Sequence, residues 1–377
     1  MKKVAIVTIY DNNNYGNRLQ NYATQEVMRK LNFDATTLKN SYLLNKDCTN
    51  AKYIVQVIKF CVRYIQGYVK NFTRRVRFNE FNKNIKLSKK YVTKYNIAKL
   101  NEKFDYFVCG SDQVWNPEFR RMTEFDLLEF ADNKKKVSFS ASFGSSVLDD
   151  EYLNKAEKEL KKFKAISVRE EAGKTIAKEL TKREDIEVLV DPTMLLKKDE
   201  WKKLEKKPEK LEKGKKYILN YFLGEISKEK KDIIENFAKE KEYEIINILD
   251  TKSPFYKTGP SEFLYLIHNA EIVFTDSFHA CVFSILYNKP FYVIERVEKG
   301  MKNMNSRIDT LLNKMGLQNR KFEAVIENDC EGIYEEVNKK LNIENNNPHK
   351  TVFSSYTPNP IPTEKLSILT LKANNKA

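Results

Sequence analysis

Short apolar runs alternate with stretches of helical period over the first half of the chain. Residues 3–9 form a β-rich run of strand length, and apolar residues then recur at helical spacing from about 19 to 31. Further strand-like runs lie at 104–109, 136–141, 165–168 and 186–190, with a helix predicted near 170–180. This alternation predicts a mostly parallel sheet covered by helices on both faces.

A second alternating series begins at residue 217. Strands are predicted at 217–222, 244–249, 271–275 and 291–295, and helices near 228–239, 261–269, 306–315 and 332–341. The Lys/Glu-rich stretch 197–216 has little apolar pattern, so we interpret it as a polar linker with a solvated helix around Trp201. The sequence therefore predicts two α/β domains with a cleft between them.

The predicted boundaries follow from these patterns. The first domain comprises 1–196, the second comprises 217–345, and the polar tail 346–377 is expected to be extended or partly disordered.

The segment 271–294 says most about function. An apolar run too short for a helix ends at Asp276, a natural N-cap, and an apolar stretch of helical length follows at once. His279 is then expected in the first turn of a buried helix, where free N–H groups and the helix dipole favour an anion. From this segment alone, a core histidine that only caps its neighbour is the alternative.

Composition limits the class of protein. The 377 residues are 41% hydrophobic, enough for two cores, and no apolar window has the length needed to span a bilayer. No signal peptide is evident at the N-terminus. The five scattered cysteines indicate reduced structural thiols and a cytoplasmic protein, and no Cys/His set has metal-ligand spacing, so we expect no metal.

The net charge of +15 is concentrated in one segment. Residues 51–100 contain thirteen basic residues, with Glu80 as the only acid. The apolar, helix-length run 53–65 lies within this segment, which we interpret as a basic helical insertion. It can lie on an anionic membrane surface, or it can be a packed helix with a solvated basic flank. Nucleic acid is not an expected partner, because no known nucleic-acid-binding module is present.

Several polar side chains follow predicted strands, at the sheet edge where open α/β sheets bind ligands. Asn17 and Arg18 lie in a loop with a single glycine, so a sugar or phosphate is expected there rather than a dinucleotide. Asp112 close to Trp115 suits a sugar, since carboxylates bind hydroxyl pairs and rings cover C–H faces. Arg169 opens a helix and can bind a carboxylate or phosphate as a fork. Each also has a structural alternative as a turn, a helix cap or a local ion pair.

Short motifs in order along the chain resemble those of polysaccharide pyruvyl transferases. They lie at 15–23, 108–116, 167–170, 190–193, 259–263 and 275–279, at Phe283 with Pro290, and at 306–308. The set is specific although no single motif is. The resemblance extends from about residue 3 to 317 and leaves out the basic segment and the tail.

The resemblance implies a fold similar to GT-B glycosyltransferases, with two Rossmann-like domains and a central cleft. Family members move pyruvate from phosphoenolpyruvate onto two hydroxyls of a sugar, as a cyclic ketal. By resemblance, His279 is the general acid that protonates the methylene carbon, and Asp112 orients or deprotonates the acceptor. Arg169 is expected to hold the carboxylate or phosphate of the donor. Substrate binding is further assigned to Asn17, Arg18, Ser277, Phe278, Arg307 and Trp115.

One position departs from the family pattern. Many pyruvyl transferases have Arg two residues before the histidine, where this chain has Ser277. A lost guanidinium on a dianion is worth about 1.5–3 kcal/mol. Arg307 or Arg18 can replace it from a neighbouring loop. Otherwise this branch is a GT-B-type glycosyltransferase that uses a nucleotide sugar, or a non-catalytic glycan-binding member.

The sequence thus predicts a pyruvyl transferase-like enzyme that acts on a surface-polysaccharide precursor. The expected partners are phosphoenolpyruvate and a glycan or lipid-linked sugar, with no cofactor beyond the donor substrate. The expected location is the cytoplasm, with a peripheral contact of the segment 51–100 at the inner membrane face.

Overall fold

The protein is described by a computed structural model. The described residues are 1–10, 13–40, 71–93, 95–119, 122–145, 148–296, 306–323, 334–335 and 337–338. The predicted helix near 332–341, the tail 346–377 and the apolar run 53–65 lie wholly or mainly outside them.

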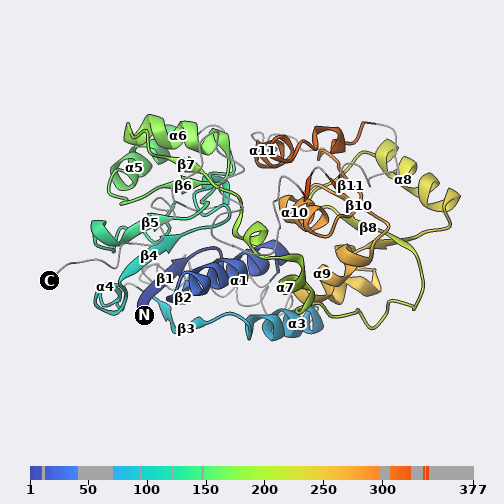
Figure 1. The fold of residues 1–377 in the computed structure, drawn as a ribbon, viewed down its shortest axis with the longest axis horizontal. Coiled ribbons are helices and arrows are strands. Elements are labelled where there is room, and N and C mark those ends of the chain that lie inside the picture. Colours follow the sequence, from blue (N-terminus) through green and yellow to red (C-terminus); the bar gives the residue numbers. More distant parts are fainter. Residues whose placement is uncertain are drawn as a thin grey trace, which may run out of the picture.

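The first half is built on a parallel sheet of strand order β3-β2-β1-β4-β5, the order of a Rossmann fold (Figure 1). Its strands are β1 (Lys2–Val7), β2 (Phe33–Asn40), β3 (Leu87–Val92), β4 (Tyr106–Cys109) and β5 (Lys136–Ser138). A parallel pair, β6 (Ser167–Val168) and β7 (Glu187–Val188), continues the sheet through bridges from Val137 to Ala165 and from Ala141 to Val168. The covering helices are α1 (Tyr15–Lys30), α3 (Phe72–Asn82), α4 (Leu100–Lys103), α5 (Asp150–Leu160) and α6 (Glu171–Thr181).

The second half has a parallel sheet of order β11-β10-β8-β9. Its strands are β8 (Tyr217–Tyr221), β9 (Glu244–Asn247), β10 (Ile272–Thr275) and β11 (Phe291–Val293). Its helices are α8 (Lys228–Glu240), α9 (Pro260–Asn269), α10 (Phe278–Leu286) and α11 (Ser306–Met315), with α7 (Lys198–Lys202) before the first strand. Short 3-10 turns are η2 (Pro117–Phe119), η3 (Asn133–Lys135), η4 (Pro192–Leu195), η5 (Pro254–Lys257) and η6 (Gln318–Arg320).

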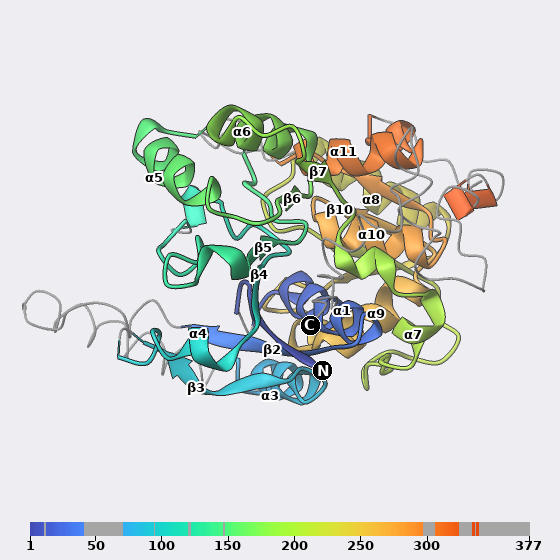
Figure 2. The same ribbon diagram turned by 60° about the vertical axis from the view of Figure 1, so that its left-hand side comes forward.

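Two Rossmann-like halves lie side by side in a GT-B-like arrangement, which confirms the predicted fold class (Figure 1). Helix α1 of the first half lies next to α9 of the second, as both views show (Figure 2). The ring of Tyr15 in α1 stacks on Phe263 in α9, with centroids 4.6 Å apart and planes within 3°. The halves are therefore joined by a packed aromatic contact as well as by the chain.

The prediction that 51–100 is an insertion is wrong for its second part. Strand β3 is an edge strand of the first sheet and pairs with β2 from Thr37↔Leu87 to Asn40↔Val92. Helix α3 packs against α9 and η5 of the second half. The high content of Lys and Arg hid both elements, because an edge strand and a surface helix tolerate a basic solvent face.

The prediction of a solvated helix in the linker is also wrong. Trp201 in α7 is fully buried, and its indole N–H donates to the carbonyl of Thr193 over 3.1 Å. The indole packs against Tyr22 of α1 at 5.6 Å and against Phe283 of α10 at 4.9 Å. A single large aromatic residue thus anchors a segment whose other residues are mostly charged.

Candidate active site between the two halves

The predicted site residues meet where strands of both sheets end. In the first sheet the strand order reverses between β1 and β4, and the loop after β4 carries Asp112. Asn17, which was predicted in the loop after β1, lies instead in the first turn of α1. In the second sheet it reverses between β8 and β10, and His279 follows β10. Open α/β sheets bind ligands at such switch points. With Arg169 and Asp191, which follow β6 and β7, these three residues form the central cluster.

Arg169 holds the centre of this cluster. Its guanidinium donates to Asp191 Oδ2 over 2.8 Å and to Asp112 Oδ1 over 3.3 Å. It also lies over the ring of Phe278, 4.3 Å from the centroid. The side chain is only 1% exposed, so two carboxylates compensate a cation that is removed from water.

His279 brings the second half into the cluster. It lies in the first turn of α10, as predicted, and its Nε2 is 3.7 Å from Asp191 Oδ2. Nε2 is buried without a hydrogen-bond partner among the described residues. The ring also lies against Gly16 of α1, where an added Cβ would be 2.2 Å from Nδ1. Nε2 thus lies at ion-pair distance from Asp191 but makes no hydrogen bond to it, so the ring can still donate or accept a proton.

Asp112 is held from three sides. Asn17 donates to Asp112 Oδ2, and the backbone N–H of Gln113 donates to Oδ1 over 2.9 Å. Burial alone would raise the pKa of Asp112, but the charges of Arg169 and His279 outweigh it and keep the pKa below its usual range. Asp112 is therefore a carboxylate at neutral pH, suited to accept hydrogen bonds.

Asp191 is the residue of the cluster to which the sequence assigned no role. Besides Arg169, it accepts hydrogen bonds from Ser111 over 2.8 Å and from Thr193 over 2.7 Å. Burial alone would raise its pKa, but interactions with His279 and Arg169 bring it well below the usual range. The sequence could have identified Asp191 as a site residue, because it lies in the motif 190–193, directly after a predicted strand.

Arg307 in α11 is a second buried guanidinium beside the cluster. Its Nε has no hydrogen-bond partner among the described residues. Burial and the charge of Arg169 lower the pKa of Arg307 to about 10. The nearby Glu170 is buried as well, and burial raises its pKa in spite of opposing effects from Arg169 and Arg307. The raised pKa makes Glu170 less readily ionised than an ordinary glutamate. Arg307, with a pKa of about 10, is positively charged at neutral pH and can attract an anion.

Trp115 is not a binding platform, and this assignment is wrong. The ring is fully buried in the core of the first half, 5.1 Å from the ring of Phe143 and 5.9 Å from that of Phe163. Its indole N–H donates to the carbonyl of Asp126 over 3.3 Å. The ring therefore stabilises the loop that carries Asp112 by packing in the core of the first half.

Arg18 has no contact with the central cluster among the described residues. It is fully buried, donates to the carbonyl of Ile9 over 2.8 Å and lies 4.8 Å from the ring centroid of Tyr10. Substrate binding by Arg18 stays a prediction.

Ser277, rather than Asp276, is the N-cap of α10, and the predicted N-cap is therefore wrong. Asp276 instead accepts from the backbone N–H groups of Leu223 and Gly224 over 2.7 and 2.8 Å and pairs with Arg296 at 2.6 Å. It thus joins the loops after β8 and β10. Ser277 is buried, and no side-chain hydrogen bond caps the helix at this position.

The described residues contain neither a metal-binding group nor a membrane-spanning helix. No group of three or more His, Cys, Asp or Glu side chains there has the arrangement of a metal site. No helix within those ranges has the length and apolar character required to cross a membrane.

The chain is similar in fold to two solved structures of low sequence identity. One is UDP-GlcNAc 2-epimerase from Neisseria meningitidis bound to UDP-GlcNAc, with 13% identity, a TM-score of 0.47 and coverage of 99% of this chain and 100% of that chain. The other is the same enzyme from Methanocaldococcus jannaschii in complex with UDP-GlcNAc and UDP, with 13% identity, a TM-score of 0.46 and the same coverage.

Sequence comparison is more specific. No curated protein matches the chain. Residues 14–296, however, match the sequence model of the family described as polysaccharide pyruvyl transferase. This span includes the central cluster and both sheets apart from β1. The chain therefore belongs to the polysaccharide pyruvyl transferase family.

Proposed function

We propose that this protein transfers pyruvate from phosphoenolpyruvate to two hydroxyls of a sugar in a surface-polysaccharide precursor, forming a cyclic ketal and phosphate. The observation that carries the proposal is the meeting of His279, from one half, with the paired Asp112, Arg169 and Asp191 of the other. An acid, a hydroxyl acceptor and buried cations are the groups that this transfer requires.

The donor anion is assigned to Arg307 more than to Arg169. Arg169 already forms ion pairs with Asp112 and Asp191, whereas no carboxylate among the described residues forms an ion pair with Arg307. Arg307 Nε is also buried without a hydrogen-bond partner in that part of the chain. A dianionic donor would compensate the charge of Arg307 and supply the missing acceptor. Arg307 thereby takes over the cationic role expected at the position of Ser277, and Arg169 orients the two aspartates.

The chemical step balances with the groups present. His279 gives a proton to the methylene carbon of phosphoenolpyruvate, which leaves positive charge at C2. The first sugar hydroxyl bonds to C2, and the second then displaces phosphate. The products are the cyclic pyruvate ketal of the sugar, in which C2 of the pyruvate carries a methyl group and a carboxylate, and inorganic phosphate. The low pKa of Asp112 makes it a weak base, so it orients the attacking hydroxyl by accepting its hydrogen bond. One hydroxyl proton returns to His279, and the other leaves with the phosphate.

Calorimetric titration of phosphoenolpyruvate tests the donor assignment. We expect saturable binding to the wild type and binding roughly tenfold weaker or more to Arg307→Ala, because a charged hydrogen bond is lost. Arg29→Ala is the matched control, since Arg29 is 67% exposed and pairs with Glu26 in the last turns of α1. Absence of binding to the wild type, with and without glycan acceptors, would overturn the phosphoenolpyruvate assignment. A screen of nucleotide sugars would then test the glycosyltransferase alternative.

We also propose that the enzyme acts in the cytoplasm, with its basic segment at the inner membrane face. Deletion of 51–100 is an unsuitable test, because β3 and α3 belong to the fold. Charge reversal at Lys52, Lys59 and Arg63 changes no residue of either element, because all three precede α3 in the sequence. We expect it to reduce sedimentation with anionic liposomes. Unchanged sedimentation would contradict the membrane contact.

A further inference from the structure

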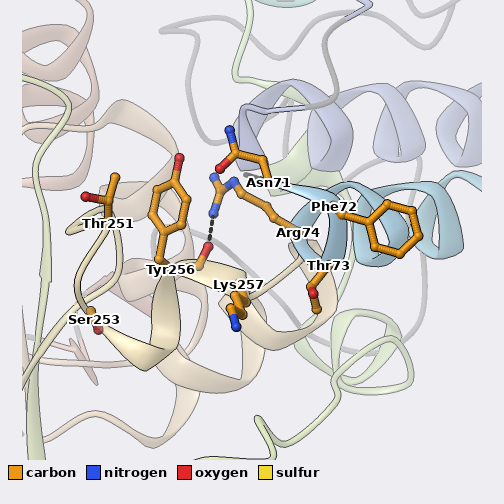
Figure 3. A pocket seen from close by; sticks show the side chains of 8 residues that line it. All are labelled: Asn71, Phe72, Thr73, Arg74, Thr251, Ser253, Tyr256 and Lys257. Atoms are coloured by element: carbon orange, nitrogen blue, oxygen red, sulfur yellow. Dashed lines mark hydrogen bonds between the residues drawn. The ribbon is translucent and has the colours of Figure 1, made fainter. Parts of the chain in front are cut away.

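A polar pocket lies outside the central cluster, between the first turn of α3 and the segment that contains η5 (Figure 3). Its volume is about 190 Å³, comparable to a small sugar unit. Because α3 belongs to the first half and η5 to the second, the pocket, like the central cluster, lies between the two halves.

The pocket is positively charged. Arg74 and Lys257 line it, and no acidic residue does. Arg74 is only 3% exposed and donates to the carbonyls of Asn13 over 2.9 Å and Tyr256 over 3.0 Å. No carboxylate within the described ranges forms an ion pair with Arg74. Backbone carbonyls and the rings of Tyr15, Phe78 and Tyr256 surround its guanidinium instead. A buried, uncompensated guanidinium beside an exposed lysine favours an anionic ligand.

The remaining lining suits a sugar. The ring of Tyr256 lies beside the guanidinium of Arg74, with its centroid 5.2 Å from Cζ, and its carbonyl accepts from the same group (Figure 3). Thr73 and Thr251 add hydroxyls. Asn71 Oδ1 is buried without a partner among the described residues, so it is available to accept from a ligand hydroxyl. Aromatic, hydroxyl and amide groups together are typical of carbohydrate sites.

The first turn of α1 connects this pocket to the central cluster. Arg74 donates to the hydroxyl of Tyr15. The next residue, Gly16, lies against His279, and Asn17 donates to Asp112. Three consecutive residues thus contact the pocket cation, the general acid and the acceptor-orienting carboxylate.

From the charge, lining and position we infer that this pocket binds an anionic sugar, one that carries a phosphate or a carboxylate. That the sugar is a second unit of the glycan acceptor rests on the proposed function; binding to the pocket does not. The two sources of negative charge are distinguished by the probes used in the test.

Four probes titrated into the wild type by calorimetry test the inference: glucose 1-phosphate, glucuronate, glucose and inorganic phosphate. We expect saturable binding of at least one anionic sugar. Glucose and inorganic phosphate should each bind with an affinity roughly tenfold lower or more. Preference between the first two probes assigns the anion. Equal binding of inorganic phosphate, or no binding of either anionic sugar, would overturn the inference.

Two variants place the binding in the pocket. Lys257→Glu reverses the charge of an exposed residue that lines the pocket. We expect it to weaken the binding of the anionic sugar tenfold or more. Lys158→Glu, at an exposed lysine on α5 that does not line the pocket, is the matched control and should change the affinity less than twofold. His279→Ala should leave this binding intact, which separates it from the proposed transfer. Equal effects of Lys257→Glu and Lys158→Glu would contradict the location.

Discussion

At the residue scale, the site depends on how a few buried charges compensate one another. Arg169 is shared by Asp112 and Asp191, and Asp191 is in turn shared with His279. This chain of contacts fixes each group through its neighbour, while His279 Nε2 and Arg307 Nε keep capacity for a ligand. A rigid frame with a few open positions is what a preorganised active site requires.

The first prediction concerns His279. His279→Ala should lower pyruvate transfer roughly 10²–10⁴-fold, the contribution of a general acid, with phosphoenolpyruvate affinity little changed. Phosphate release with a glycan acceptor measures the transfer. His268→Ala is the control, because His268 contacts Glu205 and stacks on Tyr287 in the second half. Full activity of His279→Ala would rule out its role as the acid.

The second prediction concerns Asp191 and pH. Its folded-state pKa is lowered, so its ionised form stabilises the protein fully above the unfolded value of about 3.9, and this stability is lost as pH falls further. Asp191→Asn should cost about 3–5 kcal/mol at neutral pH, because a buried charge pair is broken. Its unfolding free energy should also fall less steeply below about pH 4.

Urea unfolding at a series of pH values measures both effects. Asp199→Asn is the matched control, since Asp199 is 87% exposed, and its curve should follow that of the wild type. Parallel acid slopes for Asp191→Asn and the wild type would show that Asp191 is not the titrating group.

The residues that the sequence could identify are those that follow a buried strand in a recognisable motif. Asp112, Arg169 and His279 were found in this way, and the structure brings them together. Trp115 was misassigned because a sequence does not show which side of a loop its ring occupies. The partners of Arg169 could not be foreseen either, since Asp112 and Asp191 are 57 and 22 residues away.

At the element scale, the first turn of α1 is the most constrained part of the site. The side chain of Asn14 caps the helix by accepting from the N–H of Asn17 over 3.2 Å, and this fixes where the turn begins. Gly16 then faces His279 so closely that no Cβ fits. The helix thus sets the position of His279, which belongs to the other half.

Gly16→Ala is the third prediction. In an ordinary helix this change stabilises by up to about 1 kcal/mol, but here the Cβ would lie 2.2 Å from His279 Nδ1. We expect a loss of about 1–3 kcal/mol from overpacking, and roughly 100-fold lower transfer from displacement of the imidazole. Thermal unfolding and phosphate release measure the two effects.

Gly214→Ala is the control for this element. Nothing lies within 4 Å of an added Cβ there, but φ is +80°, which disfavours a side chain. The variant should therefore lose some stability and keep its full activity. A stabilised and fully active Gly16→Ala would show that the helix moves freely relative to His279.

Elements were predictable where period and composition agree. The strands around 104–109 and 271–275 and the helix after the latter were found, because buried parallel strands are nearly continuous apolar runs. Helix α3 and strand β3 were missed, since their faces toward water are basic and only a few positions are buried. Helix α7 is anchored by Trp201 alone, and a single buried residue does not produce the apolar periodicity from which a packed helix is predicted.

At the scale of the whole molecule, one hydrophobic core extends through both halves. The cluster that contains Tyr15, Leu19 and Met28 of α1 also contains Phe263 and Phe283 of the second half. Two further clusters are each confined to one half, around Trp115 in the first and around Ile234 in the second. The polar linker expected from the sequence therefore does not describe the junction, which is packed like a domain interior.

This shared core leads to the last prediction. When the junction is weakened, the backbone amides of both halves should lose their protection against hydrogen exchange together. Trp201→Ala should cost about 3–5 kcal/mol, since a buried indole is removed between α1 and α10. Hydrogen exchange followed by mass spectrometry should then show faster exchange in both β1 and β10. Ile234→Ala, confined to the outer cluster of the second half, should accelerate exchange mainly in β8–β10. If Trp201→Ala affected one half only, the halves would be independent domains, and the contact of His279 with Asp191 would have to form anew at each closure.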